Sequence, residues 1–115
     1  MNPVQQRIAG LIDHTLLNET ASGEDHIRLC EEARKWNFRT VCVYPHFVEL
    51  CVSELEKSGI DVCTVIDFPD GKGDSERNMD DALMMISEGA MELDMVMDIN
   101  AFGIREYERV AEGIQ

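Results

Sequence analysis

Carboxylate side chains alternate with apolar ones near the end of the sequence. Residues 91–100 read MELDMVMDIN, in which Glu92, Asp94 and Asp98 fall on one side of an extended chain. The other side is apolar: Leu93, Met95, Met97 and Ile99. Carboxylates can hold and release protons in general acid–base catalysis. The period of two predicts a β-strand with one apolar face and one face rich in carboxylates.

Thiols are the second group of side chains that could do chemistry. The sequence has four cysteines, each inside an apolar pattern: Cys30, Cys42, Cys51 and Cys63. There is no CxxC motif and no Cys/His pair at zinc spacing, so we expect no metal site. We expect reduced thiols that behave as small hydrophobic side chains.

The three histidines show no pattern typical of a catalytic or metal site. His14 falls on the apolar side of the first expected strand, so we expect a structural role for it. His26 and His46 lie in expected helices without partners nearby in the sequence. We expect both on the surface.

Length and charge limit the kinds of protein that the sequence can encode. The chain has 115 residues and a net charge of −13 at pH 7, which suits a single domain over residues 1–115. This charge argues against nucleic acid and against an anionic membrane as partners. The start of the sequence lacks the apolar core of a signal peptide, and no apolar run approaches ~18 residues. We expect a cytoplasmic protein.

Short apolar runs alternate with helical patterns along the chain. Strands are expected near residues 11–15 and at 39–44, 61–68 and 91–100. Helices are expected at 3–10, 22–36, 45–59, 75–89 and 104–114. Ser22 and Asp25 fit a capping box, and Asn37 fits a helix stop. Ser75 is expected to cap a later helix with an apolar stripe: Met79, Ala82, Leu83 and Ile86.

Alternating strands and helices predict an α/β fold with parallel strands and right-handed crossovers. An open doubly wound sheet and half of an eight-stranded barrel both fit this order. With the apolar side of each strand under helices, the other side collects Asp13, Thr15, Thr40, Cys42, Tyr44, Thr64, Glu92, Asp94 and Asp98. Unpaired carboxylates are costly to bury. The polar face therefore favours the half-barrel of four βα units, with its carboxylates toward the lumen.

Five segments resemble, in order, the signatures of the deoxyribose-phosphate aldolase family. They are LIDHTLL (11–17), CEEA (30–33), VCVYPHFV (41–48), TVIDFPDG (64–71) and ELDMVMDI (92–99). The resemblance covers essentially the whole chain and implies the N-terminal half of a (βα)₈ class I aldolase, which uses no metal or other cofactor. It further implies reversible cleavage of 2-deoxyribose 5-phosphate to acetaldehyde and glyceraldehyde 3-phosphate through a lysine Schiff base.

The resemblance also assigns four site residues. Asp94 matches the family's aspartate that relays protons through water at the Schiff-base carbon, and it is the expected catalytic residue. Asp13 and Thr15 match polar residues at the mouth of the first strand. Cys42 matches a cysteine that faces the active site in some members. We expect these last three to line the site.

The lysines differ from the pattern that the resemblance implies. The family's Schiff-base lysine lies on its sixth strand, and its phosphate loops follow the seventh and eighth strands. The lysines of this sequence are Lys35, Lys57 and Lys72, of which only Lys72 follows a strand on the catalytic side. A nucleophilic lysine must be neutral. Lys72 has three acidic neighbours that favour its charged form, namely Asp70, Asp74 and Glu76. We expect no aldolase activity from the chain alone.

Three functions remain open from the sequence. The chain could be an aldolase half that handles a phosphorylated deoxysugar or small aldehydes. It could be a non-catalytic half-barrel that forms homo-oligomers or pairs with a complementary C-terminal half. It could bind a small molecule on an open sheet, although neither GxGxxG nor GxxxxGK[ST] occurs. Apolar side chains expected on the inner face favour oligomerisation: Tyr44, Val62, Ile66 and Val96.

Overall fold

A computed structural model describes residues 1–115 and contains one parallel sheet in the order β1-β2-β3-β4. The strands are β1 (Asp13–Leu16), β2 (Thr40–Val43), β3 (Asp61–Ile66) and β4 (Glu92–Met95). The helices are α1 (Pro3–Ala9), α2 (Gly23–Trp36), the 3₁₀ helix η1 (Pro45–Phe47), α3 (Val48–Glu54), α4 (Ser75–Ser87), α5 (Ile99–Gly103) and α6 (Tyr107–Ile114). The predicted alternation of parallel strands and helices is confirmed.

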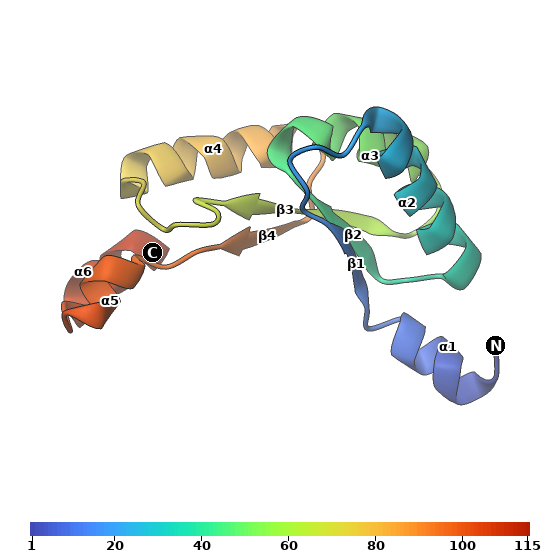
Figure 1. Cartoon of the computed structure of the whole chain (residues 1–115), viewed down its shortest axis with the longest axis horizontal. Coiled ribbons are helices and arrows are strands. Elements are labelled where there is room, and N and C mark those ends of the chain that lie inside the picture. The colour runs from blue at the N-terminus through green and yellow to red at the C-terminus, as the bar shows by residue number, and fades with distance from the viewer.

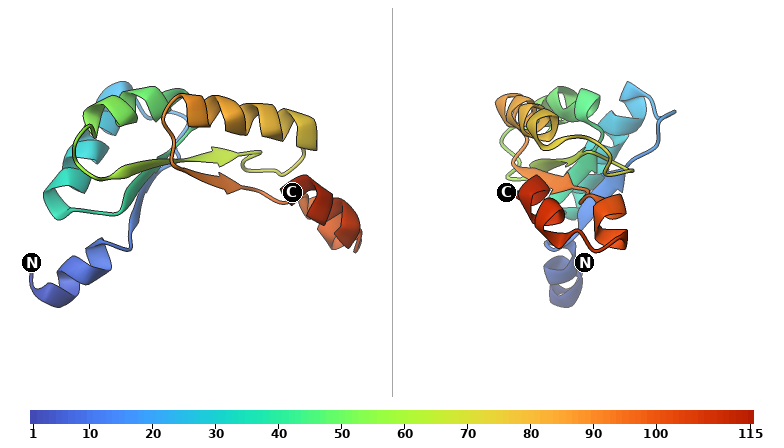
Figure 2. Two further views of the ribbon diagram at one scale, coloured as in Figure 1. Left: turned by 180° about the vertical axis from the view of Figure 1, so that it is seen from behind. Right: turned by 90° about the vertical axis from the view of Figure 1, so that its left-hand side faces the viewer.

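The helices cover only one face of the sheet. In Figure 1, α2, α3 and α4 form a layer above the curved strands, and the face below the strands is open. Figure 2 shows that α1 and the α5–α6 pair lie at opposite ends of this open side. No helix combines the length and the apolar character needed to cross a bilayer.

The core fills the space between β2, β3 and the helix layer. Val41, Val43 and Val62 point into this space and are at most 2% exposed. They join a cluster of 13 buried residues that also contains Leu29, Ala33, Val48, Cys51 and Met85. Burial of aliphatic side chains between a sheet and helices is the main stabilising term of such a fold.

Three expected face assignments on β3 are wrong. Val62 and Ile66 were expected on the inner face, but both lie in the core under the helices. Thr64 also faces the helix side, where it is buried and its Oγ1 donates to the carbonyl of Val43 at 2.7 Å. The strand reads DVCTVI, which is largely apolar on both faces, so its periodicity could not define the inner one. The inner face of β3 instead carries Cys63 and Val65.

The segment 91–100 is only partly a strand. β4 ends at Met95, and Asp98 caps α5 by accepting a hydrogen bond from the N–H of Ala101 at 2.9 Å. Asp98 is therefore not the lumen-facing strand residue that the alternation predicted. The helix expected at 104–114 is confirmed as α6, but it begins only at Tyr107, because Arg105 takes a left-handed conformation between α5 and α6 (φ 64°).

Local capping explains where the longer helices begin. The expected capping box is confirmed, since Ser22 Oγ accepts from the N–H of Asp25 and the Asp25 carboxylate accepts from the N–H of Ser22. These bonds lower the pKa of Asp25 below its ordinary value. The predicted cap of α4 is one residue off, because Asp74 accepts from the N–H of Arg77 at 2.8 Å and Ser75 is the first helical residue.

The histidines differ in how well the sequence placed them. His26 was expected on the surface, but it is 1% exposed and stacks on Phe47 with ring centroids 3.6 Å apart. His14 lies on the helix side of β1 as expected, with Nε2 3.4 Å from a carboxylate oxygen of Glu32. His46 is exposed as expected. Phe47, 21 residues further along the chain, covers one face of the His26 ring.

The apolar stripe expected on α4 packs into the core only at Ala82. Met79, Leu83 and Ile86 are each more than half exposed, and the helix buries Asn78 and Met85 instead. The stripe is therefore an apolar surface that a neighbouring element or chain could cover.

The loop after β3 is held close to the segment after β4. Gly71 has a φ of +69°, and a Cβ at this position would lie 2.1 Å from the carbonyl oxygen of Met97. Real Cβ atoms do not approach a backbone oxygen so closely, so any side chain would push the two segments apart. Gly59 has a similar φ of +77°, but nothing lies within 4 Å of its Cβ position.

We predict that Gly71→Ala destabilises the protein more than Gly59→Ala. Both substitutions carry the strain of a positive φ, so their difference isolates the clash, which should cost about 1–3 kcal/mol. Urea unfolding followed by circular dichroism measures both values. Equal free energies of unfolding for the two variants would show that the loop does not depend on this close approach.

Candidate functional site

The open face of the sheet carries polar side chains from all four strands. Parallel pairing sets Thr15 beside Cys42, Cys42 beside Cys63, and Val65 beside Asp94. Asp13 of β1 lies on the same face, two residues before Thr15. All four residues singled out in the sequence, Asp13, Thr15, Cys42 and Asp94, therefore belong to one surface.

Short polar contacts fix the amino-terminal part of this face. Thr40 Oγ1 donates to Asp13 Oδ1 at 2.6 Å, and Thr15 Oγ1 donates to the carbonyl of Asp13 at 2.9 Å. Arg39 pairs with Glu92 at 2.7 Å, which links the start of β2 to the start of β4. Asp13 and Glu92 thus have partners.

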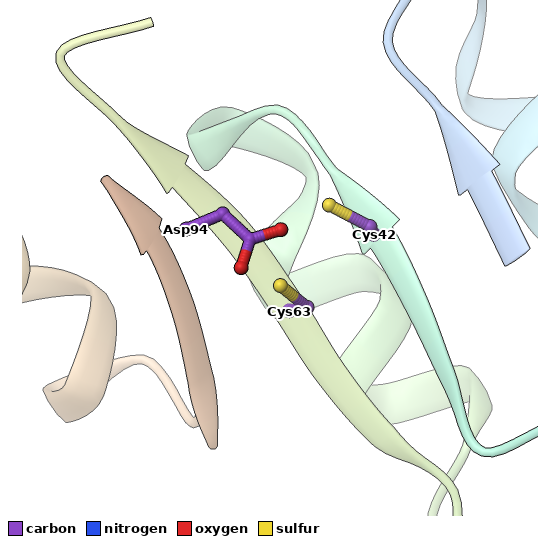
Figure 3. A group of neighbouring side chains, drawn as sticks. All are labelled: Cys42, Cys63 and Asp94. Carbon is purple, nitrogen blue, oxygen red and sulfur yellow. The ribbon is translucent and has the colours of Figure 1, made fainter. Parts of the chain in front are cut away.

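Asp94 lies differently from these two carboxylates. It is exposed on the open face and forms no ion pair. Figure 3 shows its carboxylate reaching across β3 toward the side chains of Cys42 and Cys63. A carboxylate in this position, held on a strand and free of a basic partner, can accept and return a proton.

The two thiols and the Asp94 carboxylate form a compact cluster. The Sγ atoms of Cys42 and Cys63 and one oxygen of Asp94 lie within 4.8 Å of one another. The cysteines are 3% and 0% exposed. Hydrogen bonding to Cys42 raises the pKa of the Cys63 thiol, and burial and the charge of Asp94 act in the same direction. The hydrogen bond from Cys63 lowers the pKa of Cys42.

Sequence reasoning missed Cys63 as part of this surface. Its strand is apolar on both sides, so only the pairing of Cys63 with Cys42 and Glu92 shows which way it points. The pairing of Val65 with Asp94 shows that Val65 faces the open side, and a residue two positions earlier, Cys63, must share that face. The sequence alone does not define this pairing, so it could not have identified Cys63.

A second polar region lies where β3 leads into α4. Asp67 Oδ1 accepts from the N–H of Gly73 at 2.8 Å, and its Oδ2 accepts from Asn78 at 3.1 Å. These bonds shape the loop beside a cleft of about 560 Å³ whose lining includes Lys72 and Asp70. Lys72 therefore has acidic neighbours in the structure as well as in the sequence.

None of the three lysines lies on a strand. Lys35 is on α2, where its Nζ lies 4.9 Å from the ring centroid of Trp36. Lys57 is in the turn after α3, and Lys72 is in the loop after β3. The strands of the open face therefore carry carboxylates and thiols but no lysine, and Lys72 lies at the cleft that Val65 also lines.

The chain is similar in sequence and in structure to known proteins. A deoxyribose-phosphate aldolase from Carboxydothermus hydrogenoformans is 44% identical over 109 residues, which make up 95% of this chain and 48% of that protein. A crystal structure from Coccidioides immitis, of a protein assigned as a deoxyribose-phosphate aldolase, matches with a TM-score of 0.93 and 36% identity. This match covers 97% of the present chain and 44% of the other.

The chain is a half-length relative of the deoxyribose-phosphate aldolases. It spans about half the length of the relatives it matches, consistent with their N-terminal half. A tetrameric deoxyribose-phosphate aldolase from Aeropyrum pernix also matches, with a TM-score of 0.78, 33% identity, and coverage of 84% of this chain and 41% of that one. No family model matches the sequence. The likeness to these aldolases confirms the predicted half-barrel.

We predict that the thiols of Cys42 and Cys63 differ in their rate of alkylation. At about pH 8, iodoacetamide should modify Cys42 before Cys63 in the native chain, because a thiolate is the reacting form and the hydrogen bond favours it on Cys42. Mass spectrometry of peptides from timed samples measures the order. Urea-unfolded chain, in which the two rates should converge, is the control. Faster modification of Cys63 in the native chain would contradict the assignment.

Proposed function

We propose that this chain supplies the Asp94-bearing half of an aldolase active site. The reaction is the reversible cleavage of 2-deoxyribose 5-phosphate to acetaldehyde and glyceraldehyde 3-phosphate. The observation that carries the proposal is the position of Asp94 on the open face of a half-barrel whose relatives bear the name of this enzyme. The Schiff-base lysine would come from a complementary set of βα units.

The open face supports this role once it becomes the inside of a closed barrel. A second half would cover Asp94 and restrict its contact with bulk water, which strengthens its interaction with a nearby charge. In the proposed mechanism, Asp94 delivers a proton, through water, to the carbon next to the Schiff base after C–C cleavage, and it takes a proton from that carbon in the direction of synthesis. Acid–base assistance of this kind typically contributes about 10²–10⁴-fold to the rate.

Asp13, Thr15 and Cys42 would line the same lumen. Their proposed role is to shape the polar wall beside the reacting carbon rather than to exchange protons. The hydrogen bond from Thr40 to Asp13 favours this interpretation, because it occupies one oxygen of the Asp13 carboxylate. Asp94 instead lies beside the thiols of Cys42 and Cys63 and forms no ion pair.

A non-catalytic assembly module is the second candidate. The sheet order leaves one side of β1 and one side of β4 without a neighbouring strand, and such edges pair readily with another chain. The exposed stripe of α4 adds apolar surface: Met79, Leu83 and Ile86. Val62 and Ile66, which were expected to favour oligomerisation, lie in the core. The exposed stripe of α4 would supply apolar contact area in their place.

We predict no measurable aldolase turnover from the 115-residue chain alone. Without an imine, the carbanion formed on C–C cleavage has no electron sink. Retro-aldol cleavage coupled to detection of acetaldehyde tests this, together with borohydride trapping of any Schiff base. Turnover accompanied by a trapped adduct on Lys72, both lost in Lys72→Ala, would overturn the prediction.

We predict that Asp94→Asn abolishes most of the activity when a C-terminal half from a relative is supplied. The amide keeps the shape of the side chain but cannot accept the proton, so the rate should fall by about 10²-fold or more. Asp80→Asn on α4 is the matched control, because it removes the same charge from an exposed site. Unchanged turnover in an assembled Asp94→Asn protein would refute the role of Asp94.

We also predict that the chain alone forms a homodimer or a larger oligomer. Burial of ~600 Å² of apolar surface on each of two partners is worth roughly 30 kcal/mol before association costs. Carboxylates of two copies would repel each other, so the assembly should loosen at low salt. Sedimentation velocity at micromolar concentration measures this. A folded monomer at all salt concentrations would contradict it.

A further inference from the structure

We propose that Cys42, Cys63 and Asp94 form a binding site for a thiophilic divalent metal ion such as Zn²⁺. The three ligand atoms, two Sγ and one carboxylate oxygen, lie within 4.8 Å of one another. Figure 3 shows all three side chains converging on one point above β3. The proposal departs from the expectation of no metal site, which rested on local motifs, because these three ligands come from three different strands.

The backbone already holds the ligands in place. Cys42 and Cys63 are directly paired across β2 and β3, and Asp94 is paired with Val65, the next residue on the same face as Cys63. Sites on rigid strands need little reorganisation when a ligand binds. Both thiols are buried while Asp94 is exposed, so an ion could enter from the open face.

The dimensions of the cluster fit a tetrahedral ion. Zn–S bonds of about 2.3 Å place two sulfur ligands about 3.8 Å apart, so small side-chain rotations suffice to close the site. Two thiolates and one carboxylate leave a fourth position for water. Thiolate ligands select Zn²⁺ and related soft ions over Mg²⁺ and Ca²⁺.

The surrounding charges favour a cation. Asp13 on β1 and Glu92 on β4 lie on the same face as Cys42 and Cys63, so this part of the open face is acidic. Arg39, which pairs with Glu92, is the opposing positive charge on this face. Binding of the ion to two thiols and one carboxylate releases two protons, so the affinity should rise with pH.

The other cysteine pair provides an internal control. Cys30 and Cys51 are also buried, at 1% and 0% exposed, and they lie close enough to hydrogen-bond. They belong to the core between α2 and α3, and no third ligand joins them. Only the pair on the open face has a carboxylate at metal-binding distance.

Titration of the reduced 115-residue chain with Co²⁺ tests the site. Co²⁺ is a spectroscopic substitute for Zn²⁺, and we expect thiolate-to-metal charge-transfer absorption that saturates at one ion per chain and disappears when Zn²⁺ is added. Alanine at Cys42 or Cys63 should weaken binding by at least about tenfold, because loss of even an outer ligand contact commonly costs 10–100-fold. Asp94→Asn should weaken binding while retaining the charge-transfer absorption.

The paired substitution Cys30→Ala/Cys51→Ala should leave the titration unchanged. Alkylation of the unmodified folded chain is a second measurement that needs no variant: Zn²⁺ should slow the alkylation of Cys42 and Cys63 and leave the rates at Cys30 and Cys51 unchanged. Absence of charge-transfer absorption, or absorption that persists without Cys42 and Cys63, would overturn the proposal. These readouts do not depend on aldolase activity, so failure of the metal site and failure of the proposed proton relay can be told apart. The ion and the relayed proton would use the same Asp94 carboxylate, so the two states exclude each other.

Discussion

The carboxylates of β4 impose the main physical constraint on this half-barrel. Glu92 and Asp94 alternate with Leu93 and Met95, and the apolar pair packs against the helix-covered core. An unpaired carboxylate under a second layer of helices would lose its hydration without compensation. The opposite face of the sheet must therefore stay open or close around a polar lumen, and the helices of this chain accordingly cover one face only (Figure 1).

The same constraint explains why the two faces of the other strands carry different kinds of side chain. On β2, Val41 and Val43 fill the core while Cys42 faces the lumen side, so one strand serves both stability and the site. Small thiols suit this face because they bury sulfur against neighbouring strands and leave space above. The half-barrel leaves some groups without partners. The outer edges of β1 and β4 have no neighbouring strand, and the apolar stripe of α4 is exposed.

Local rules in the sequence predicted much of the fold, and non-local contacts explain what they missed. Ser22, Asp25 and Asn37 act within a few residues of one another, so the start and end of α2 could be predicted from the sequence. The burial of His26 depends on Phe47, and the contribution of Cys63 depends on strand register, which periodicity does not encode when both faces of β3 are apolar. Asp98 continued the alternation of β4, but its capping bond to Ala101 favours a helix start.

The central claim is that Asp94 moves the proton at the carbon next to the Schiff base. Exchange of the methyl protons of acetaldehyde with D₂O, followed by NMR in the protein assembled with a complementary half, measures that step apart from C–C cleavage. The account predicts that Asp94→Asn still forms a borohydride-trappable imine but loses nearly all of the exchange. Undiminished exchange with the imine intact would contradict it.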